Sequence, residues 1–341
     1  MTTSGGLRVG LNPYGLTYTL GLQALGTDRA NPRPGGVNAF LDLADEIGAQ
    51  VVELHNVWLD ELGRAGRLAL GARLEDRGLT PVVSASRYWE GVETVLDNAL
   101  DLGARTVRLA LSAVLCGDRA AVGPARWARV IAEIQKDLAQ IAPQAADHDV
   151  AIAIENHQDF GSAELVAFCE EAGDAVGITF DIGNAFAVAE SPLAFARTVA
   201  PRVRHVHLKD YRVQFAEEGY RLVRCAIGDG AVPFREVLHV LLAEAGATGR
   251  ELTASIEPGA LEARYIRVLT PEWWRGYAPR DARDFVETLR AAGHNRLAPD
   301  ADFRTPWERE APADELIAYE HDMLLRSAAN LRALGLMGVA A

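Results

Sequence analysis

Short apolar runs rich in β-branched residues alternate with segments of helical periodicity along most of the chain. Eight of these runs are expected to be strands, and the segments between them are expected to be helices. This alternation is typical of a parallel sheet covered by helices, and eight such units close into a cylinder. The sequence therefore predicts an α/β protein, a (β/α)8 TIM barrel, with strands at residues 7–11, 50–54, 80–85, 106–111, 150–154, 176–180, 203–208 and 253–256.

The segments between these runs carry apolar residues at helical spacing, and a glycine follows several of them just before the next strand. Gly48, Gly78, Gly103 and Gly173 stand where the end of a helix commonly requires a left-handed residue. Seven helices are expected, at residues 37–47, 59–77, 89–102, 123–148, 162–171, 192–199 and 233–245.

Three longer segments interrupt the alternation, after the first, seventh and eighth predicted strands. They span residues 17–36, 210–232 and 258–301. Such extended loops lie at the C-terminal ends of barrel strands, where they shape substrate access. Residues 313–334 have apolar side chains at helical spacing and predict an extra C-terminal helix. We expect one TIM-barrel domain over residues 1–341, with the barrel at about 7–300 and a helical tail at about 312–336.

The composition limits the possible partners and compartment. The formal net charge of −13 disfavours nucleic acid, because phosphate backbones are bound by basic patches. No run of roughly 18 or more apolar residues occurs, so no membrane segment is expected, and residues 1–6 lack the features of a signal peptide. The cysteines form no C-x-x-C motif and indicate a reducing cytoplasm; they are Cys116, Cys169 and Cys225.

Four ionisable residues stand at the C-terminal ends of four successive predicted strands: Glu155, Asp181, His207 and Glu257. In a barrel these ends converge, because the strands are neighbours in one closed sheet. Burying four such groups without a partner would cost several kcal/mol, so a divalent cation is the natural compensation. The ligand set suits Mn²⁺, with Mg²⁺ or Co²⁺ as alternatives. The competing interpretation is a buried ion network that uses Arg204 or Lys209.

A cation held by these residues would polarise a carbonyl oxygen and make the neighbouring C–H bond acidic. Glu155 and Glu257 come from strands five and eight, on opposite sides of the ligand arc. They suit proton removal on one face of a bound sugar and proton return on the other. His157 lies two residues beyond Glu155 and is a further candidate catalytic acid, base or substrate ligand, with a plain surface histidine as the alternative.

Other polar residues near the strand ends are candidate substrate contacts. Lys209 directly follows the strand of His207 and is expected either to stabilise an oxyanion or to form a salt bridge with Asp210. Glu53 and His55 end the second strand, and one of them is expected to contact the substrate.

Arg108 alternates with apolar residues on the fourth strand, so we expect it to face the barrel interior as a partner for Glu53 or Glu155. Four tryptophans are candidates either for stacking against a sugar or aglycone or for core packing: Trp58, Trp89, Trp273 and Trp274. The glycine-containing segment 228–230 lacks the pattern of a phosphate-binding loop and is expected to be a tight turn before the helix at Pro233.

The stretches around these positions resemble the xylose isomerase-like superfamily of sugar isomerases and epimerases. They are residues 154–157 (IENH), 180–184 (FDIGN), 205–210 (HVHLKD), 227–230 (IGDG) and 255–258 (SIEP). The resemblance extends from residue 7 to about 260. It implies a metal site, usually for Mn²⁺, and proton transfer by two glutamates in the epimerases. The ligands that it implies are Glu155, Asp181, His207 and Glu257.

The chain departs from this superfamily's pattern at two positions. Many relatives carry a histidine three residues after the ligand aspartate, where this chain has Asn184. An asparagine can hydrogen-bond a substrate hydroxyl but does not titrate near neutral pH. The arginine that ketose 3-epimerases carry just beyond the ligand histidine has no clear match, since Arg212 is offset from its position.

The resemblance leaves several activities open. The leading hypothesis is a metal-dependent isomerase or epimerase acting on a keto-sugar or related polyol. The second is a lyase that follows the same proton removal with loss of water, as in inosose dehydratases, or of a carbon-linked aglycone. The latter corresponds to the large subunit of a C-glycoside deglycosidase and would require a small second subunit. A homo-oligomer is expected in either case.

Two further interpretations are weaker. The superfamily's DNA-repair branch, which resembles endonuclease IV, needs about three metals and additional histidines at the strand ends. Strands three and four end here without histidine, at residues 84–86 and 111–112, and the chain is acidic. A barrel without catalytic activity is disfavoured by the intact set of four candidate ligands. We therefore expect a cytoplasmic enzyme with a small sugar or glycoside as substrate.

Overall fold

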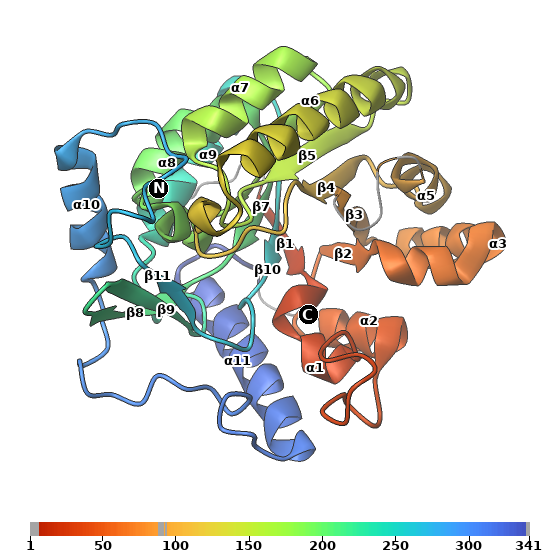
Figure 1. Ribbon diagram of the computed structural model, residues 1–341. Helices are drawn as coiled ribbons and strands as arrows, with labels where there is room; N and C mark the ends of the chain where they lie inside the picture. The colour runs from red at the N-terminus through yellow and green to blue at the C-terminus, as the bar shows by residue number, and fades with distance from the viewer. Residues whose placement is uncertain (1–6, 88–91, 93, 339–341) are drawn as a thin grey trace.

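The computed structural model describes residues 7–87, 92 and 94–338. Its centre is a closed barrel of eight parallel strands in the spatial order β1-β10-β7-β6-β5-β4-β3-β2 (Figure 1). The predicted barrel is confirmed, and each observed strand lies within one residue of its predicted bounds. The barrel strands are β1 (Leu7–Leu11), β2 (Val51–His55), β3 (Thr80–Ser86), β4 (Thr106–Ala110), β5 (Ala151–Glu155), β6 (Val176–Asp181), β7 (Val203–Leu208) and β10 (Leu252–Ile256).

Helices surround this barrel, and local signals in the sequence set their ends. The Ser191 hydroxyl accepts a hydrogen bond from the Ala194 N–H at 3.2 Å, with Pro192 at the first helical position of α8. Gly103 ends α5 with a φ of 79°, which only glycine adopts without strain. The helices are α2 (Gly36–Glu46), α3 (Asn56–Asp76), α5 (Val95–Leu102), α6 (Pro124–Asp147), α7 (Ser162–Ala172), α8 (Pro192–Val199) and α9 (Phe234–Ala247).

The helix predicted to begin at residue 89 is described only from Val95, and Trp89 lies outside the described residues. The hydrophobic core fills the layer between strands and helices. Phe180 of β6 stacks on Phe195 of α8 at a centroid distance of 5.0 Å, and both are fully buried. The barrel lumen is more polar, since buried Thr179 and Ser255 share it with the site residues. The apolar layer between strands and helices therefore stabilises the fold, whereas the polar side chains of the candidate site lie in the lumen.

The predicted loop after the seventh strand is largely a β-hairpin. Strands β8 (Tyr211–Ala216) and β9 (Gly219–Arg224) pair antiparallel, and β11 (Arg264–Ile266) joins them in a three-stranded sheet. Alternation explains the hairpin, because Tyr211 and Val213 are buried while Arg212 between them is exposed. A 3-10 turn, η1 (Pro13–Gly15), precedes the first insertion, which begins with a short helix, α1 (Thr17–Leu20).

The third insertion covers the loops that follow β4 and β6. Trp273 donates its indole N–H to the Cys116 carbonyl at 2.8 Å, and the Tyr277 hydroxyl donates to the Gly117 carbonyl at 3.0 Å. Trp273 also packs edge-to-face on Trp274 at 4.9 Å. These tryptophans, like Trp58 against Phe40, therefore pack within the protein, which favours the second of the two roles expected for them. This insertion ends with helix α10 (Ala282–Ala292).

The predicted C-terminal helix is present as α11 (Ala313–Ala333) and lies against α1 (Figure 1). The buried Glu320 carboxylate accepts hydrogen bonds from the backbone N–H groups of Tyr18 at 3.0 Å and Thr19 at 2.8 Å. Leu324 and Leu331 bury the apolar side of the helix. Within the described part of the chain, no helix has the length and apolarity needed to cross a bilayer.

Candidate metal centre and active site

The structure brings together the four residues that the sequence proposes as metal ligands. One potential ligand atom from each residue lies within 4.8 Å of those of the other three. Their strands are consecutive in the barrel, in the order β10, β7, β6 and β5, so the residues form an arc with a glutamate at each end. All four are buried: Glu257, His207, Asp181 and Glu155.

An irregularity in β7 contributes to this arrangement. Ile178 of β6 pairs with Val203, but Thr179 pairs with His205, so one residue of β7 is left without a counterpart. Beyond this bulge, Asp181 and His207 lie side by side in register. Bulges re-aim side chains next to functional sites, and here the shift sets two candidate ligands at the same level of the barrel.

Several buried polar atoms in this arc make no hydrogen bond of good geometry with the described residues, although some of them lie close to one another. They include one oxygen of Asp181 (Oδ1), one oxygen of Glu257 (Oε2) and the Nδ1 atom of His207. The Nδ1 atom lies 2.9 Å from Glu257 Oε2 and 3.3 Å from Glu155 Oε1. Unpartnered buried atoms are costly, and three oxygens and a nitrogen converging on one point form the donor set of a divalent-metal site. The residues present therefore fit a divalent cation.

The remaining oxygens of the candidate ligands are held by cations from the barrel. Lys209 contacts Asp181 through Oδ2 and Glu257 through Oε1, the latter at 2.5 Å. Arg108 forms an ion pair with Glu155 Oε2, one of the two partners expected for it. Each carboxylate thus turns one oxygen to a basic residue and the other to the shared point.

The salt bridge considered between Lys209 and Asp210 is not formed, because both residues have other partners. The Asp210 carboxylate accepts hydrogen bonds from four backbone N–H groups at 2.9–3.1 Å. Two of these donors are Gly228 and Gly230, in the segment expected to be a tight turn. Asp210 therefore shapes the turn, while the ammonium group of Lys209 remains in the metal centre.

Glu53 lies behind His207, the candidate ligand histidine. Its Oε2 atom is 2.8 Å from His207 Nε2 and 3.3 Å from His205 Nε2, and its side chain is fully buried. His55, the second candidate on β2, accepts the Val57 N–H at 3.2 Å and caps α3. Burial and the charge of Arg108 lower the pKa of His55 to about 4. Both side chains thus have protein partners, and Glu53 contacts the candidate ligand His207.

The charges of this cluster do not balance. Burial alone would lower the pKa of His207, but the carboxylates of Glu53 and Glu257 raise it well above its ordinary value. Among the described residues, the contacts of the cluster involve four carboxylates and two permanent cations. They are Glu53, Glu155, Asp181, Glu257, Arg108 and Lys209. With His207 protonated, one negative charge remains, and a divalent cation that displaced the imidazole proton would bring the cluster to neutrality.

His157 and Asn184 lie beside the arc. The Nδ1 atom of His157 is buried and has no hydrogen-bond partner among the described residues. Burial and the charges of Arg108 and Lys209 lower its pKa to about 4, so the ring is neutral. Asn184 donates to Asp181 Oδ2 at 2.6 Å, so it contacts the candidate ligand that precedes it by three residues.

Three site residues were not anticipated. The amide of Asn12, directly after β1, lies 3.4 Å from His207 Nε2. Tyr211 donates its hydroxyl hydrogen to Asn184 Oδ1 at 3.3 Å. His205 lies beneath His207 and contacts Ser255 and Thr253. The period of two along a strand was the available signal for His205, because it places residues 205 and 207 on the same face.

Comparison with known proteins agrees with this architecture. A family model described as xylose isomerase-like TIM barrel matches residues 21–275. The uncharacterized protein YihM of Escherichia coli (strain K12) is 30% identical over 114 residues, which cover 33% of this chain and 35% of YihM. The inosose dehydratase of Yersinia enterocolitica is 31% identical over 132 residues, or 34% of this chain and 43% of that protein. The chain thus spans less than half of the length of these curated relatives.

Among solved structures, D-psicose 3-epimerase from Clostridium cellulolyticum H10, crystallised with D-tagatose, superposes with a TM-score of 0.56. The match covers 97% of this chain and 100% of the epimerase, at 14% sequence identity. At this identity the similarity is one of fold.

Proposed function

This chain belongs to the xylose isomerase-like TIM-barrel family, and we propose that it is a divalent-metal-dependent isomerase or epimerase acting on a keto-sugar or related polyol. The superfamily includes sugar epimerases, isomerases and dehydratases. The observation that carries the proposal is the arc of four residues, with unpartnered ligand atoms in its middle and a glutamate at each end.

Mn²⁺ is the proposed cofactor, with Mg²⁺ or Co²⁺ as alternatives, because three carboxylates and one imidazole are ligands that these ions accept. Glu155, Asp181, His207 and Glu257 would hold it. A divalent cation at this point supplies Lewis acidity toward a carbonyl oxygen and a neighbouring hydroxyl of the substrate.

The protein's own residues then move the proton. Glu155 and Glu257 lie at the two ends of the arc, so they approach a sugar above the site from opposite sides. One carboxylate removes the proton next to the carbonyl, and the other returns a proton to the opposite face, which inverts the carbon. Arg108 orients Glu155, and Lys209 orients Glu257. The neutral imidazole of His157, whose Nδ1 has no hydrogen-bond partner among the described residues, is the proposed group for exchanging a proton with a substrate oxygen.

Isotope exchange tests this proposal directly. The protein is incubated with Mn²⁺ in D₂O together with a panel of ketoses, inososes and 3-keto-glycosides. We expect deuterium to enter one carbon of one compound, with an isomeric product of the same composition apart from the label. Exchange should stop on chelation and return when Mn²⁺ is restored. A panel that shows no exchange with any divalent metal would remove the proposed proton transfer.

A lyase activity is the second candidate, favoured by the relative that is an inosose dehydratase and by the juxtaposition of Glu155 and His157. Elimination needs a base at carbon and a proton donor at the leaving oxygen: Glu155 can take the proton from carbon, and the neutral imidazole of His157 can relay a proton to the leaving oxygen. Mass spectrometry of the same incubations distinguishes the two, because a dehydratase product has lost water. Release of a carbon-linked aglycone, together with a small co-purifying subunit, would instead indicate a C-glycoside deglycosidase.

A further inference from the structure

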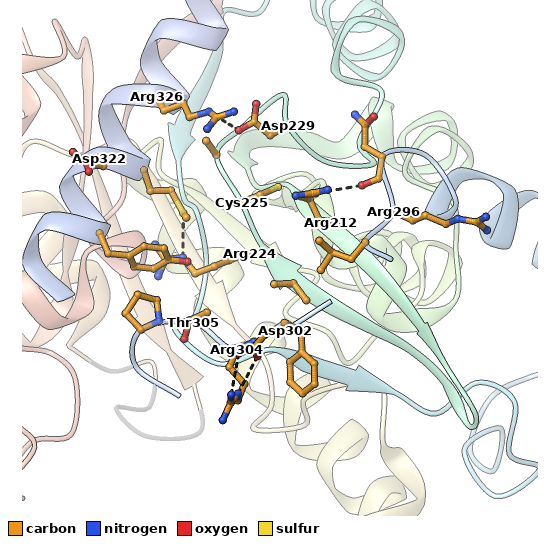
Figure 2. A pocket seen from close by; sticks show the side chains of 18 of the residues that line it. Arg212, Arg224, Cys225, Asp229, Arg296, Asp302, Arg304, Thr305, Asp322 and Arg326 are labelled. Atoms are coloured by element: carbon orange, nitrogen blue, oxygen red, sulfur yellow. Dashed lines mark hydrogen bonds and ion pairs between the residues drawn. The ribbon is translucent and has the colours of Figure 1, made fainter. Parts of the chain in front are cut away.

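A large cavity of about 880 Å³ lies outside the metal centre, at the end of the β8–β9 hairpin. Figure 2 shows its three walls: the hairpin with Arg212 and Arg224, helix α11 with Asp322 and Arg326, and the segment that carries Arg304. None of the candidate ligands or substrate contacts proposed above lines this cavity. It is therefore a separate site.

The lining is strongly basic for a chain with a net charge of −13. Three aspartates also line the cavity, at positions 229, 302 and 322, so the arginines outnumber them two to one. A local excess of positive charge in a hollow attracts anions. The six arginines are Arg212, Arg224, Arg296, Arg304, Arg309 and Arg326.

Arg224 is the residue that most needs a counter-ion. Its side chain is only 5% exposed, and it forms no ion pair with any residue that the structure describes. Two of its nitrogens donate, one to the Gly15 carbonyl at 2.9 Å and one to the Met323 sulfur at 3.2 Å. The third, Nη1, is buried and has no hydrogen-bond partner among the described residues. The charge of Arg224 acts on the buried Glu320 carboxyl and lowers its pKa against the effect of burial, so this carboxylate offsets part of the charge. Nη1 nevertheless has no acceptor and is available to an anion.

Two further arginines are available at the mouth of the cavity. Arg212 is exposed and makes one long bond, 3.4 Å, to the Asn295 carbonyl. Arg296 is exposed, and no hydrogen bond or ion pair ties it to the described residues. By contrast, Arg326 is paired with Asp229 at 2.7 Å. The guanidinium groups without an ion pair thus come from the hairpin, which carries Arg212 and Arg224, and from the segment after α10, which carries Arg296.

We propose that this cavity binds a phosphorylated small molecule. Three guanidinium groups without carboxylate partners match the charge and the several acceptor oxygens of a phosphate better than those of one carboxylate. The volume exceeds that of a phosphate ion, and Tyr319, Phe303 and Pro306 provide an apolar wall for the organic part. The phosphate binds toward Arg224, and the rest of the ligand lies along this wall.

Titration calorimetry on the metal-loaded protein at low salt tests the site, with inorganic phosphate and glucose 6-phosphate as probes and glucose as the neutral control. We expect saturable binding of both anions and none of glucose. The double variant Arg212→Gln/Arg296→Gln changes only exposed side chains, so it should fold normally. Loss of two charge-assisted contacts should weaken binding by about tenfold or more.

Two controls locate the binding. Arg275→Gln removes an exposed arginine outside the cavity and should leave the affinity unchanged. Glu155→Gln alters the metal centre and should also retain phosphate binding. The proposal is overturned if neither anion binds up to about 10 mM, if glucose binds as well as glucose 6-phosphate, or if the double variant keeps the parent affinity. Loss of binding in Glu155→Gln alone would assign the anion to the metal centre instead.

Discussion

The Nε2 atom of His207 lies 2.8 Å from Oε2 of Glu53, and both side chains are fully buried. When a metal displaces the second proton of the ring, a hydrogen bond on Nε2 keeps the remaining proton there and leaves the lone pair on Nδ1, which faces Glu155 and Glu257. This is the tautomer that a metal-binding histidine needs, and a carboxylate behind the ring also raises its basicity. We infer that Glu53 is a positioning residue rather than a substrate contact.

Replacing Glu53 should weaken metal binding without removing a ligand. We expect Glu53→Gln to reduce the affinity for Mn²⁺ by about 10–100-fold, as for other carboxylates that support a ligand histidine. The measurement is a competition titration against a chelator of known affinity. Glu61→Gln, an exposed glutamate on α3, should behave like the parent protein. Equal affinities in both variants would contradict the role given to Glu53.

Replacing either terminal glutamate of the arc should stop turnover while leaving the fold intact. Glu155→Gln and Glu257→Gln keep the side-chain shape but remove the base, so we expect rates to fall by at least about 10²–10⁴-fold at saturating Mn²⁺. The rate is that of deuterium incorporation into the substrate identified above. Circular dichroism and the melting temperature report folding, and the exposed Glu251→Gln serves as the matched control. A parent-like rate in one variant would exclude that residue from proton transfer.

The turn at residues 228–230 should depend on the charge of Asp210. Its carboxylate accepts hydrogen bonds from four backbone N–H groups. In Asp210→Asn, the side-chain NH₂ group would replace one acceptor oxygen and would face backbone donors instead. We expect a loss of at least about 3 kcal/mol in the free energy of unfolding, measured with urea. Asp229→Asn affects a partly exposed pair with Arg326 and one hydrogen bond from the Asn330 amide at 3.1 Å, and should cost only about 1 kcal/mol. A similar small effect for both variants would be inconsistent with this account.

Asp159 should make stability depend on pH. Burial raises the pKa of its carboxyl from an ordinary 3.8 to about 7. The hydrogen bond that Ser112 donates at 2.7 Å lowers the pKa but does not cancel the effect of burial. The folded state then binds one proton more than the unfolded state between about pH 4 and 7. The resulting stabilisation is complete below about pH 4 and is lost as the pH rises through about 7.

The variant Asp159→Asn removes this titration. The free energy of unfolding of the parent, taken relative to the variant, should fall by up to about 1.4 kcal/mol per pH unit within that window. Urea unfolding at several pH values from about 5 to 8 measures the difference. A difference that stays constant across this range would show that Asp159 titrates normally.

The sequence predicted the barrel because its strands are short, apolar and separated by regular helical patterns. Candidate ligands could be found in the same way, because a barrel brings the ends of neighbouring strands together whatever their separation in the chain. The neighbours of these residues were harder to assign. A salt bridge with Asp210, its neighbour in sequence, is one of the two roles expected for Lys209, whereas its partners in the structure, Asp181 and Glu257, lie on other strands.

The insertions were located correctly but not described correctly. The hairpin of β8 and β9 has a clear alternation, yet its buried side rests on residues that only the folded barrel supplies. Tyr220, for example, donates to the Phe186 carbonyl at 2.6 Å, across a separation of 34 residues. The bulge that aligns His207 with Asp181 has no local signature, because it results from how two strands pair.

The contact between Glu320 and the backbone of Tyr18 and Thr19 has a consequence for biosynthesis. These hydrogen bonds join positions 302 and 301 residues apart. A ribosome must therefore add about 300 further residues before the first short helix gains this cap. A nascent protein truncated before residue 320 would lack the acceptor for these two backbone N–H groups.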